Sequence, residues 1–180
     1  MHSSIAAFWR IIHTDNITGE VLYESEDKNV VVDNGRALNA YDVFGLGASA
    51  TVIALGAGAC STAAVHTDSH LNYEHILNAT RKTLTNTSGA ALTTPDVVST
   101  SFTDSFSEPY YRKITVQSVF NGASDGNVNQ PFQEFGLFTT TVLPGTPSGT
   151  SGTMYNHFVA NSAVILTSTT TLTVQCTIYY

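Results

Sequence analysis

The chain has 180 residues, of which 42% are hydrophobic and only 12% are charged. This length favours one domain with its own core, and the low charge leaves Ser, Thr, Asn and Gly to cover most of the surface. Soluble monomers usually carry about twice this share of charged residues, so the composition indicates assembly with other protein chains. Seven basic residues and a net charge of −7 argue against binding to phosphate backbones, so we expect no nucleic-acid partner.

The sequence predicts neither a membrane-spanning segment nor a secretion signal. No apolar run approaches about 18 residues, and the opening residues lack the basic segment, apolar core and cleavage site of a signal peptide. We therefore expect synthesis in the cytoplasm without a signal peptide and no contact with a membrane. The two cysteines, Cys60 and Cys176, are too few for a disulfide framework, and we expect both to be buried free thiols.

Patterns typical of strands begin near the N-terminus. Residues 5–13 are apolar and aromatic and residues 20–26 alternate, so with the Asn and Gly between them they predict a hairpin. A short β-type run at residues 28–32 follows. Apolar positions then recur at helical spacing over residues 36–44, which predicts the one helix, and residues 51–55 return to strand character.

The remaining two thirds of the chain are also rich in strand patterns. Residues 56–71 are small and polar and predict a loop, and periodicity does not decide between strand and helix for residues 73–84, where we favour strand. Further strands are predicted at residues 99–106, 110–120, 132–142, 154–160, 163–166 and 171–180.

Eight to ten strands and one helix predict a mainly β fold, a β-sandwich or jelly-roll-like domain with one short helix and an extended N-terminal hairpin or arm. We divide the chain into an N-terminal hairpin or docking arm at residues 1–28 and a single β-sandwich domain at residues 29–180. No fixed-period repeat or heptad pattern indicates a fibrous shaft.

One cluster has the composition of a metal site. His66, Asp68 and His70 occupy alternate positions, which on an extended chain share a face, and Glu74 and His75 follow closely. The segment nevertheless lies in a small-residue loop, and a further ligand would have to come from elsewhere. We therefore favour a polar surface loop and predict no metal ion.

Other motifs do not indicate chemistry. Residues 45–50 match the relaxed dinucleotide fingerprint, but that motif requires a strand before it and a helix after it, and here the order is reversed. No serine lies in a G-x-S-x-G elbow. Acid–base catalysis requires two acidic groups in a cleft, and the spacing of Glu24 with Glu26 or of Asp104 with Glu108 does not indicate a cleft. We predict no catalytic residues, no cofactor and no enzymatic activity.

Both ends of the chain are more apolar than termini normally are, and termini fray unless something covers them. Either neighbouring subunits cover these residues, which is the interpretation we adopt, or the subunit's own core does. The predicted interface residues are Ile5, Phe8, Trp9, Ile11, Tyr179 and Tyr180.

Several short motifs occur in a recognisable order. They are V-V-V-D-N-G-R-A-L-N-A at residues 30–40, V-I-A-L-G-A-G at 52–58, D-S-H-L-N-Y-E at 68–74 with Arg81, E-F-G-L-F at 134–138 and T-L-T-V-Q-C-T-I at 171–178. This order resembles that of small virion structural proteins of tailed bacteriophages, in which a helix after a strand, an "ALGxG" strand, a "D-x-x-L-x-x-E" segment and an "E-x-G-L-F" strand recur. The resemblance covers residues 30–180.

The resemblance implies a virion location and function through protein–protein contacts. Our first expectation is a capsid decoration or cement protein that stabilises the phage head, and the alternative is a tail, collar, baseplate or fibre-base component. A carbohydrate-binding or hydrolytic virion module is a third interpretation, from a different class. The expected partners are the chain itself, as a trimer or dimer, and the major capsid protein or another virion protein.

Overall fold

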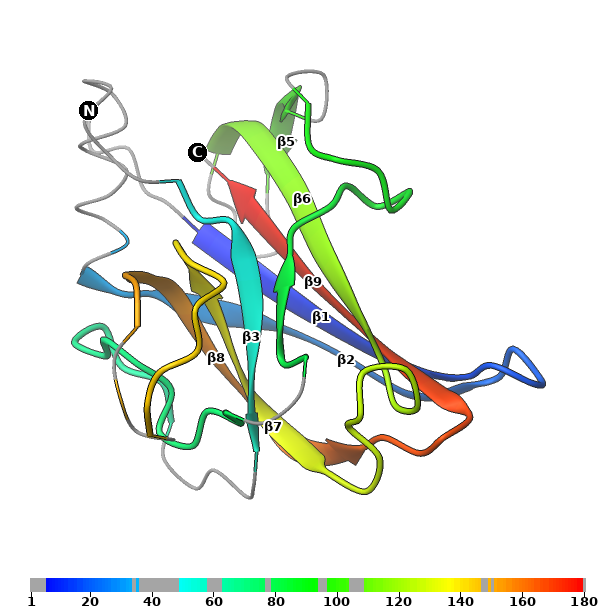
Figure 1. Ribbon diagram of the computed structural model, residues 1–180. Helices are drawn as coiled ribbons and strands as arrows, with labels where there is room; N and C mark the ends of the chain where they lie inside the picture. The colour runs from blue at the N-terminus through cyan, green and yellow to red at the C-terminus, as the bar shows by residue number, and fades with distance from the viewer. Residues whose placement is uncertain are drawn as a thin grey trace.

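Figure 1 shows the computed structural model, which describes residues 6–33, 35, 49–57, 63–76, 79–93, 97–103, 109–146, 149 and 151–179. In these residues the fold is mainly β, as the sequence predicts, whereas the helix predicted at residues 36–44 lies outside them. The strands are β1 (Ala6–Asp15), β2 (Val21–Val31), β3 (Val52–Ala57), β4 (Arg81–Thr83), β5 (Val97–Thr103), β6 (Pro109–Asn121), β7 (Pro131–Phe138), β8 (Met154–Ile165) and β9 (Thr170–Tyr179).

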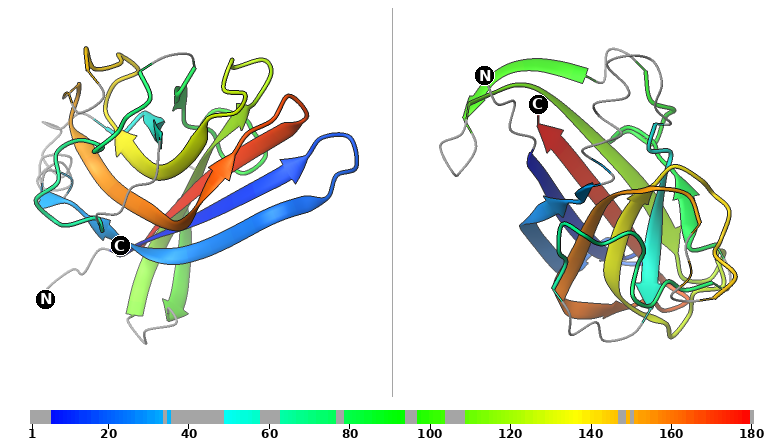
Figure 2. Two further views of the ribbon diagram at one scale, coloured as in Figure 1. Left: turned by 90° about the horizontal axis from the view of Figure 1, so that it is seen from below. Right: turned by 90° about the vertical axis from the view of Figure 1, so that its left-hand side faces the viewer.

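The strands form two antiparallel sheets that share β2. Sheet A has the order β2-β1-β9-β6-β5, and sheet B has the order β4-β3-β7-β8-β2. The long first part of β2 pairs with β1, and its last residues, Val30 and Val31, pair with β8. The two sheets lie as layers against each other (Figure 2), which is the arrangement of a β-sandwich-like domain.

The predicted N-terminal hairpin is confirmed by the pairing of β1 with β2. Its turn follows from local chemistry, because the Asp15 carboxylate accepts hydrogen bonds from the backbone N–H groups of Ile17 and Thr18, and Gly19 has a positive φ of 73°. β1 also pairs along its length with β9, so the hairpin is an inner part of sheet A. The boundary predicted between residues 28 and 29 falls within β2, which is continuous there.

The main core lies between the two sheets. In β9 the residues Leu172, Val174, Cys176 and Ile178 are buried, while the residues between them are only partly covered, as a period of two requires. Cys176 is a buried free thiol, as predicted, and Cys60 lies outside the described residues.

Two predicted strand boundaries differ from the structure. The runs at residues 154–160 and 163–166 are parts of one strand, β8, because exposed residues 161–163 bulge out where the register against β7 shifts. The described residues of the predicted strand at 73–84, which are 73–76 and 79–84, contain the short strand β4 and an isolated bridge at Glu74. The backbone of this segment at Tyr73, His75 and Thr80 is hydrogen-bonded to β3, at the edge of sheet B.

Candidate functional site

The outer face of sheet B carries a second, smaller core with buried charges around it. Leu71, from the segment of residues 63–76, packs there against buried side chains that include Val52, Phe138 and Met154. The same segment brings carboxylates and backbone N–H groups onto β7 and β8. This segment, residues 63–76, which we call the covering segment, is therefore attached to the sheet by both apolar and ionic contacts.

His157 on β8 lies between two carboxylates. Its Nδ1 is 2.6 Å from Oδ2 of Asp68 and its Nε2 is 2.8 Å from Oε1 of Glu134, while its side chain is fully buried. Burial lowers the pKa of His157, but the hydrogen bonds to Glu134 and Asp68 outweigh burial and hold that pKa above its ordinary value. Because a carboxylate oxygen faces each ring nitrogen and carboxylates accept hydrogen bonds, this geometry favours an imidazolium, which can donate from both nitrogens.

Glu134 on β7 is the most heavily bonded of these carboxylates. Besides His157, its oxygens accept hydrogen bonds from the backbone N–H groups of Asn72 and Tyr73, at 2.7 and 3.0 Å. Burial raises the pKa of Glu134, but these hydrogen bonds together lower it below its ordinary value. Gly56 on β3 makes room for this carboxyl group, because a Cβ there would lie 2.7 Å from Cβ of Glu134.

A second buried ion pair lies in the same layer. Arg81 on β4 donates from Nε and Nη2 to the two carboxylate oxygens of Glu74, and both side chains are almost completely buried. Its Nη1 donates to the backbone carbonyls of Thr140 and Ser151, both at 2.9 Å, and its guanidinium lies 4.3 Å from the ring centre of Phe138. Arg81 thus connects Thr140 and Ser151, which lie between β7 and β8, to Glu74 in the covering segment.

The pairing of these charges indicates a structural role. Both ring nitrogens of His157 are occupied by carboxylates, so neither is available to take a proton from a substrate, and the Glu74 carboxylate is held by a bidentate guanidinium. A fully paired buried network adds little net stability, but removal of one partner leaves an uncompensated charge. The network therefore specifies how the covering segment docks.

The histidine cluster predicted from the sequence is divided among different partners. Nδ1 of His66 lies 3.1 Å from Oδ2 of Asp33, and Asp68 pairs with His157. Nδ1 of His70 lies 3.1 Å from the hydroxyl of Ser69. Within the described residues no three His, Cys, Asp or Glu side chains are grouped as metal ligands. Sequence analysis did not single out His157, because its two partners lie 89 and 23 residues away.

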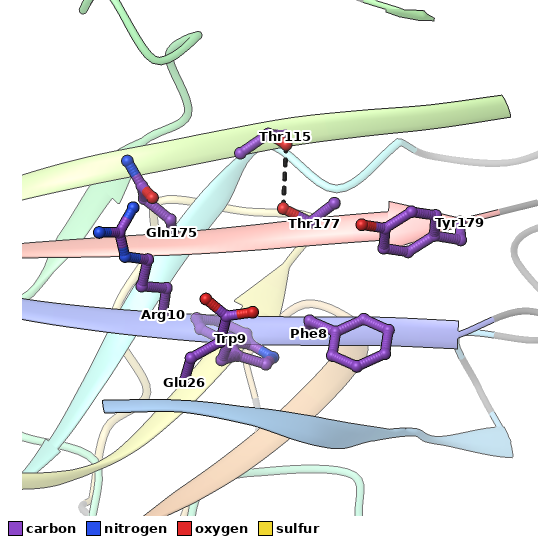
Figure 3. A pocket seen from close by; sticks show the side chains of 8 residues that line it. All are labelled: Phe8, Trp9, Arg10, Glu26, Thr115, Gln175, Thr177 and Tyr179. Carbon is purple, nitrogen blue, oxygen red and sulfur yellow. Dashed lines mark hydrogen bonds between the residues drawn. The ribbon is translucent and has the colours of Figure 1, made fainter. Parts of the chain in front are cut away.

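The outer face of sheet A is different, because partly exposed polar side chains stand on it. A cavity of about 260 Å³ lies there, lined by residues of β1, β2, β6 and β9 (Figure 3). Phe8 and Tyr179 stand at one end of it and Arg10, Glu26 and Gln175 at the other. We call this cavity the sheet A groove.

The predicted interface residues divide between core and surface. Trp9 and Ile11 are fully buried inside the subunit, where the Trp9 indole N–H donates to Asn156, so their side chains have no surface left for a partner. Tyr179 is also buried within the subunit, and Phe8, which is partly exposed, packs edge-on against it. Ile5 and Tyr180 lie outside the described residues.

Exposed apolar side chains gather instead at the turn of the β1–β2 hairpin. Ile17 is 77% exposed, and Val21 and Leu22 are each about half exposed. The turn of the hairpin projects beyond the rest of the sandwich (Figure 2), and these exposed side chains belong to that turn and to the start of β2. We call Ile17, Val21 and Leu22 the hairpin tip.

Comparison of the chain with protein-family models, with curated proteins and with solved structures found no match. In the part of the chain that the structure describes, there is no helix long and apolar enough to cross a membrane.

Proposed function

We propose that this chain is a structural subunit that works by attaching to another protein through the hairpin tip. The observation that carries the proposal is that three apolar side chains, those of Ile17, Val21 and Leu22, are exposed in and next to a turn that projects beyond the sandwich. Scattered exposed apolar residues need no explanation, but a cluster on a projecting turn is typical of a contact site. The buried ion pairs give the subunit a defined shape without providing an accessible catalytic group among the residues described above.

The charge of the hairpin indicates the kind of partner. From Asp15 to Asp27 the chain contains five carboxylates, namely those of Asp15, Glu20, Glu24, Glu26 and Asp27, and no Lys or Arg. Two such tips would repel each other, which disfavours tip-to-tip pairing of two copies. The complementary surface is an apolar pocket with Lys or Arg around its rim on a different protein.

The resemblance to small virion proteins of tailed bacteriophages supports a more specific form of this proposal. In it the partner is a shell protein and the chain is a capsid decoration or cement protein, so that many weak contacts add up over the particle. The alternative is a tail, collar, baseplate or fibre-base component. Many copies per virion would favour the capsid, and a handful would favour the tail.

A substitution at the tip tests the attachment. Ile17→Ser should weaken binding to phage particles that lack this protein by about tenfold or more, because burying an Ile side chain contributes about 1.5–3 kcal/mol. Val142→Ser is the control, since Val142 is 64% exposed but lies outside the hairpin. Co-sedimentation with such particles measures both. Equal binding by the wild type and the Ile17 variant would contradict the proposal.

A further inference from the structure

We propose that the sheet A groove is a binding site for a neutral sugar. This inference goes beyond the proposed attachment function and uses different residues. The two outer faces of the sandwich differ. The segment of residues 63–76 docks on the outer face of sheet B, whereas the outer face of sheet A presents a groove whose lining includes partly exposed polar side chains (Figure 3).

The register of three strands builds the groove. Phe8 on β1 lies opposite Thr177 on β9, which in turn lies opposite Thr115 on β6, and the two threonine hydroxyls are 2.9 Å apart. One row along, Arg10 lies between Glu26 on β2 and Gln175 on β9. Hydroxyl, amide, guanidinium and carboxylate groups are thus set within two adjacent rows of one rigid sheet.

One end of the groove is aromatic. The rings of Phe8 and Tyr179 are 5.5 Å apart at an angle of 85°, and Figure 3 shows the phenol oxygen of Tyr179 directed toward Thr177. Tyr179 is buried, so the partly exposed ring at this end is that of Phe8. An aromatic ring beside hydrogen-bonding groups suits a ligand that has both C–H faces and hydroxyls, as a sugar ring does. Trp9 also borders the groove, but its side chain is fully buried and offers no stacking surface.

The other end provides a hydrogen-bond acceptor. Nε of Arg10 donates to Glu24 at 2.7 Å, so its charge is already balanced, whereas Glu26, directly across from Arg10, makes no hydrogen bond or ion pair that we find within the described residues. A carboxylate accepts hydrogen bonds from two neighbouring hydroxyls of one sugar ring. With a net charge of −7 on the chain, an anionic ligand is disfavoured.

Two features argue against a peptide in this groove. The backbone groups of β1 and β9 are already paired with strands on both sides, so they offer no sheet edge to which a peptide strand could be added. The volume of about 260 Å³ is also at the small end for ligand pockets, which commonly span about 300–1,000 Å³. It suits a single ring, such as one residue of a glycan chain.

Titration of the isotope-labelled full chain with glucose, galactose, mannose and N-acetylglucosamine, each added separately, tests the site by amide chemical shifts. At least one sugar should produce saturable shifts at Arg10, Gln175 and Thr177. Glu26→Gln should weaken that binding about tenfold or more, because it removes a charged acceptor. Phe8→Leu should also weaken it, since it keeps an apolar side chain beside Tyr179 but removes the ring. Glu20→Gln, an exposed position of the same hairpin outside the groove, should bind as the wild type does.

Three results would overturn the inference. The first is that none of the four sugars shifts the amides of these residues. The second is that Glu20→Gln weakens binding as much as Glu26→Gln, which would show a general effect of charge. The third is that phage particles, and not sugars, perturb these amides, which would make the groove part of a protein interface.

Discussion

At the scale of single residues, the unusual feature is the number of charges that the chain buries although it has so few. The buried His157 on β8 pairs with the buried Glu134 on β7 and with the partly exposed Asp68 of the covering segment. Arg81 and Glu74 add a second, buried pair in the same layer. Each group is satisfied by a partner of opposite charge or by backbone N–H groups. Buried charges with defined partners are costly to misplace, so they favour one arrangement of the segment over its alternatives.

The buried imidazolium predicts a pH dependence of stability. The pKa of His157 is raised above 6.5 on folding, so its stabilising contribution is full below pH 6.5 and is lost as the pH rises through the folded-state pKa. The pKa of Glu134 is lowered below 4.5, so its contribution is full above pH 4.5 and is lost as the pH falls through the folded-state pKa. Burial lowers the pKa values of His13 and His75, which has the opposite effect to His157 on the slope near neutral pH.

Because of these opposing histidines, the test compares the wild type with His157→Gln. The difference in unfolding free energy between them should be largest between about pH 5 and 6.5 and should shrink as the pH rises above 6.5. Urea unfolding at a series of pH values measures it. A difference that stays constant from pH 5 to 9 would mean that His157 is neutral in the folded protein.

At the scale of elements, sheet B depends on close approach between neighbouring strands. β3 and β7 pair with Gly56 opposite Glu134, and the Glu134 side chain occupies the space that a side chain at position 56 would need. Two residues of the E-x-G-L-F motif on β7 have such structural roles. Glu134 holds the covering segment, and at Gly136 a Cβ would lie 2.7 Å from the ring of Phe138.

Gly56→Ala is therefore expected to destabilise the fold by about 1–3 kcal/mol, because the new Cβ displaces Glu134 from its hydrogen bonds in an already packed layer. Gly145→Ala is the matched control, since a Cβ there has no neighbour within 4 Å. Thermal unfolding of both variants measures the effect. Equal melting temperatures for the two variants would show that Glu134 can move at no cost.

At the scale of the whole molecule, the β1–β2 hairpin has two roles at its two ends. Near the chain terminus, β1 joins β2 to β9 in sheet A and places Trp9 and Ile11 in the main core. At the other end, β1 stays paired with β9 as far as Asp15, and the turn that follows projects beyond the rest of the sandwich and presents the hairpin tip (Figure 2). The strand order thus explains how one hairpin supports the fold and also projects a contact surface.

Deletion of residues 1–13 should therefore prevent folding. The deletion removes most of β1, leaves β2 and β9 without their shared partner, and takes Trp9 and Ile11 from the core, where truncation of a single Trp typically costs about 3–5 kcal/mol. Circular dichroism with thermal unfolding measures this. A deletion variant that retains a cooperative transition would show that these residues are a dispensable arm, which is the role first expected for residues 1–28.

The sequence by itself determined the class of fold and the positions of most strands. The period of two in residues 171–179 and the hairpin around Asp15 and Gly19 are local signals, and local signals are what a sequence displays directly. Only the tertiary structure decided which apolar residues form the core, because Trp9 and Phe8 are adjacent and equally apolar but lie on opposite faces of β1. It alone also assembled the buried network and the sheet A groove, whose members come from distant strands, since sequence spacing carries no information on which strands become neighbours.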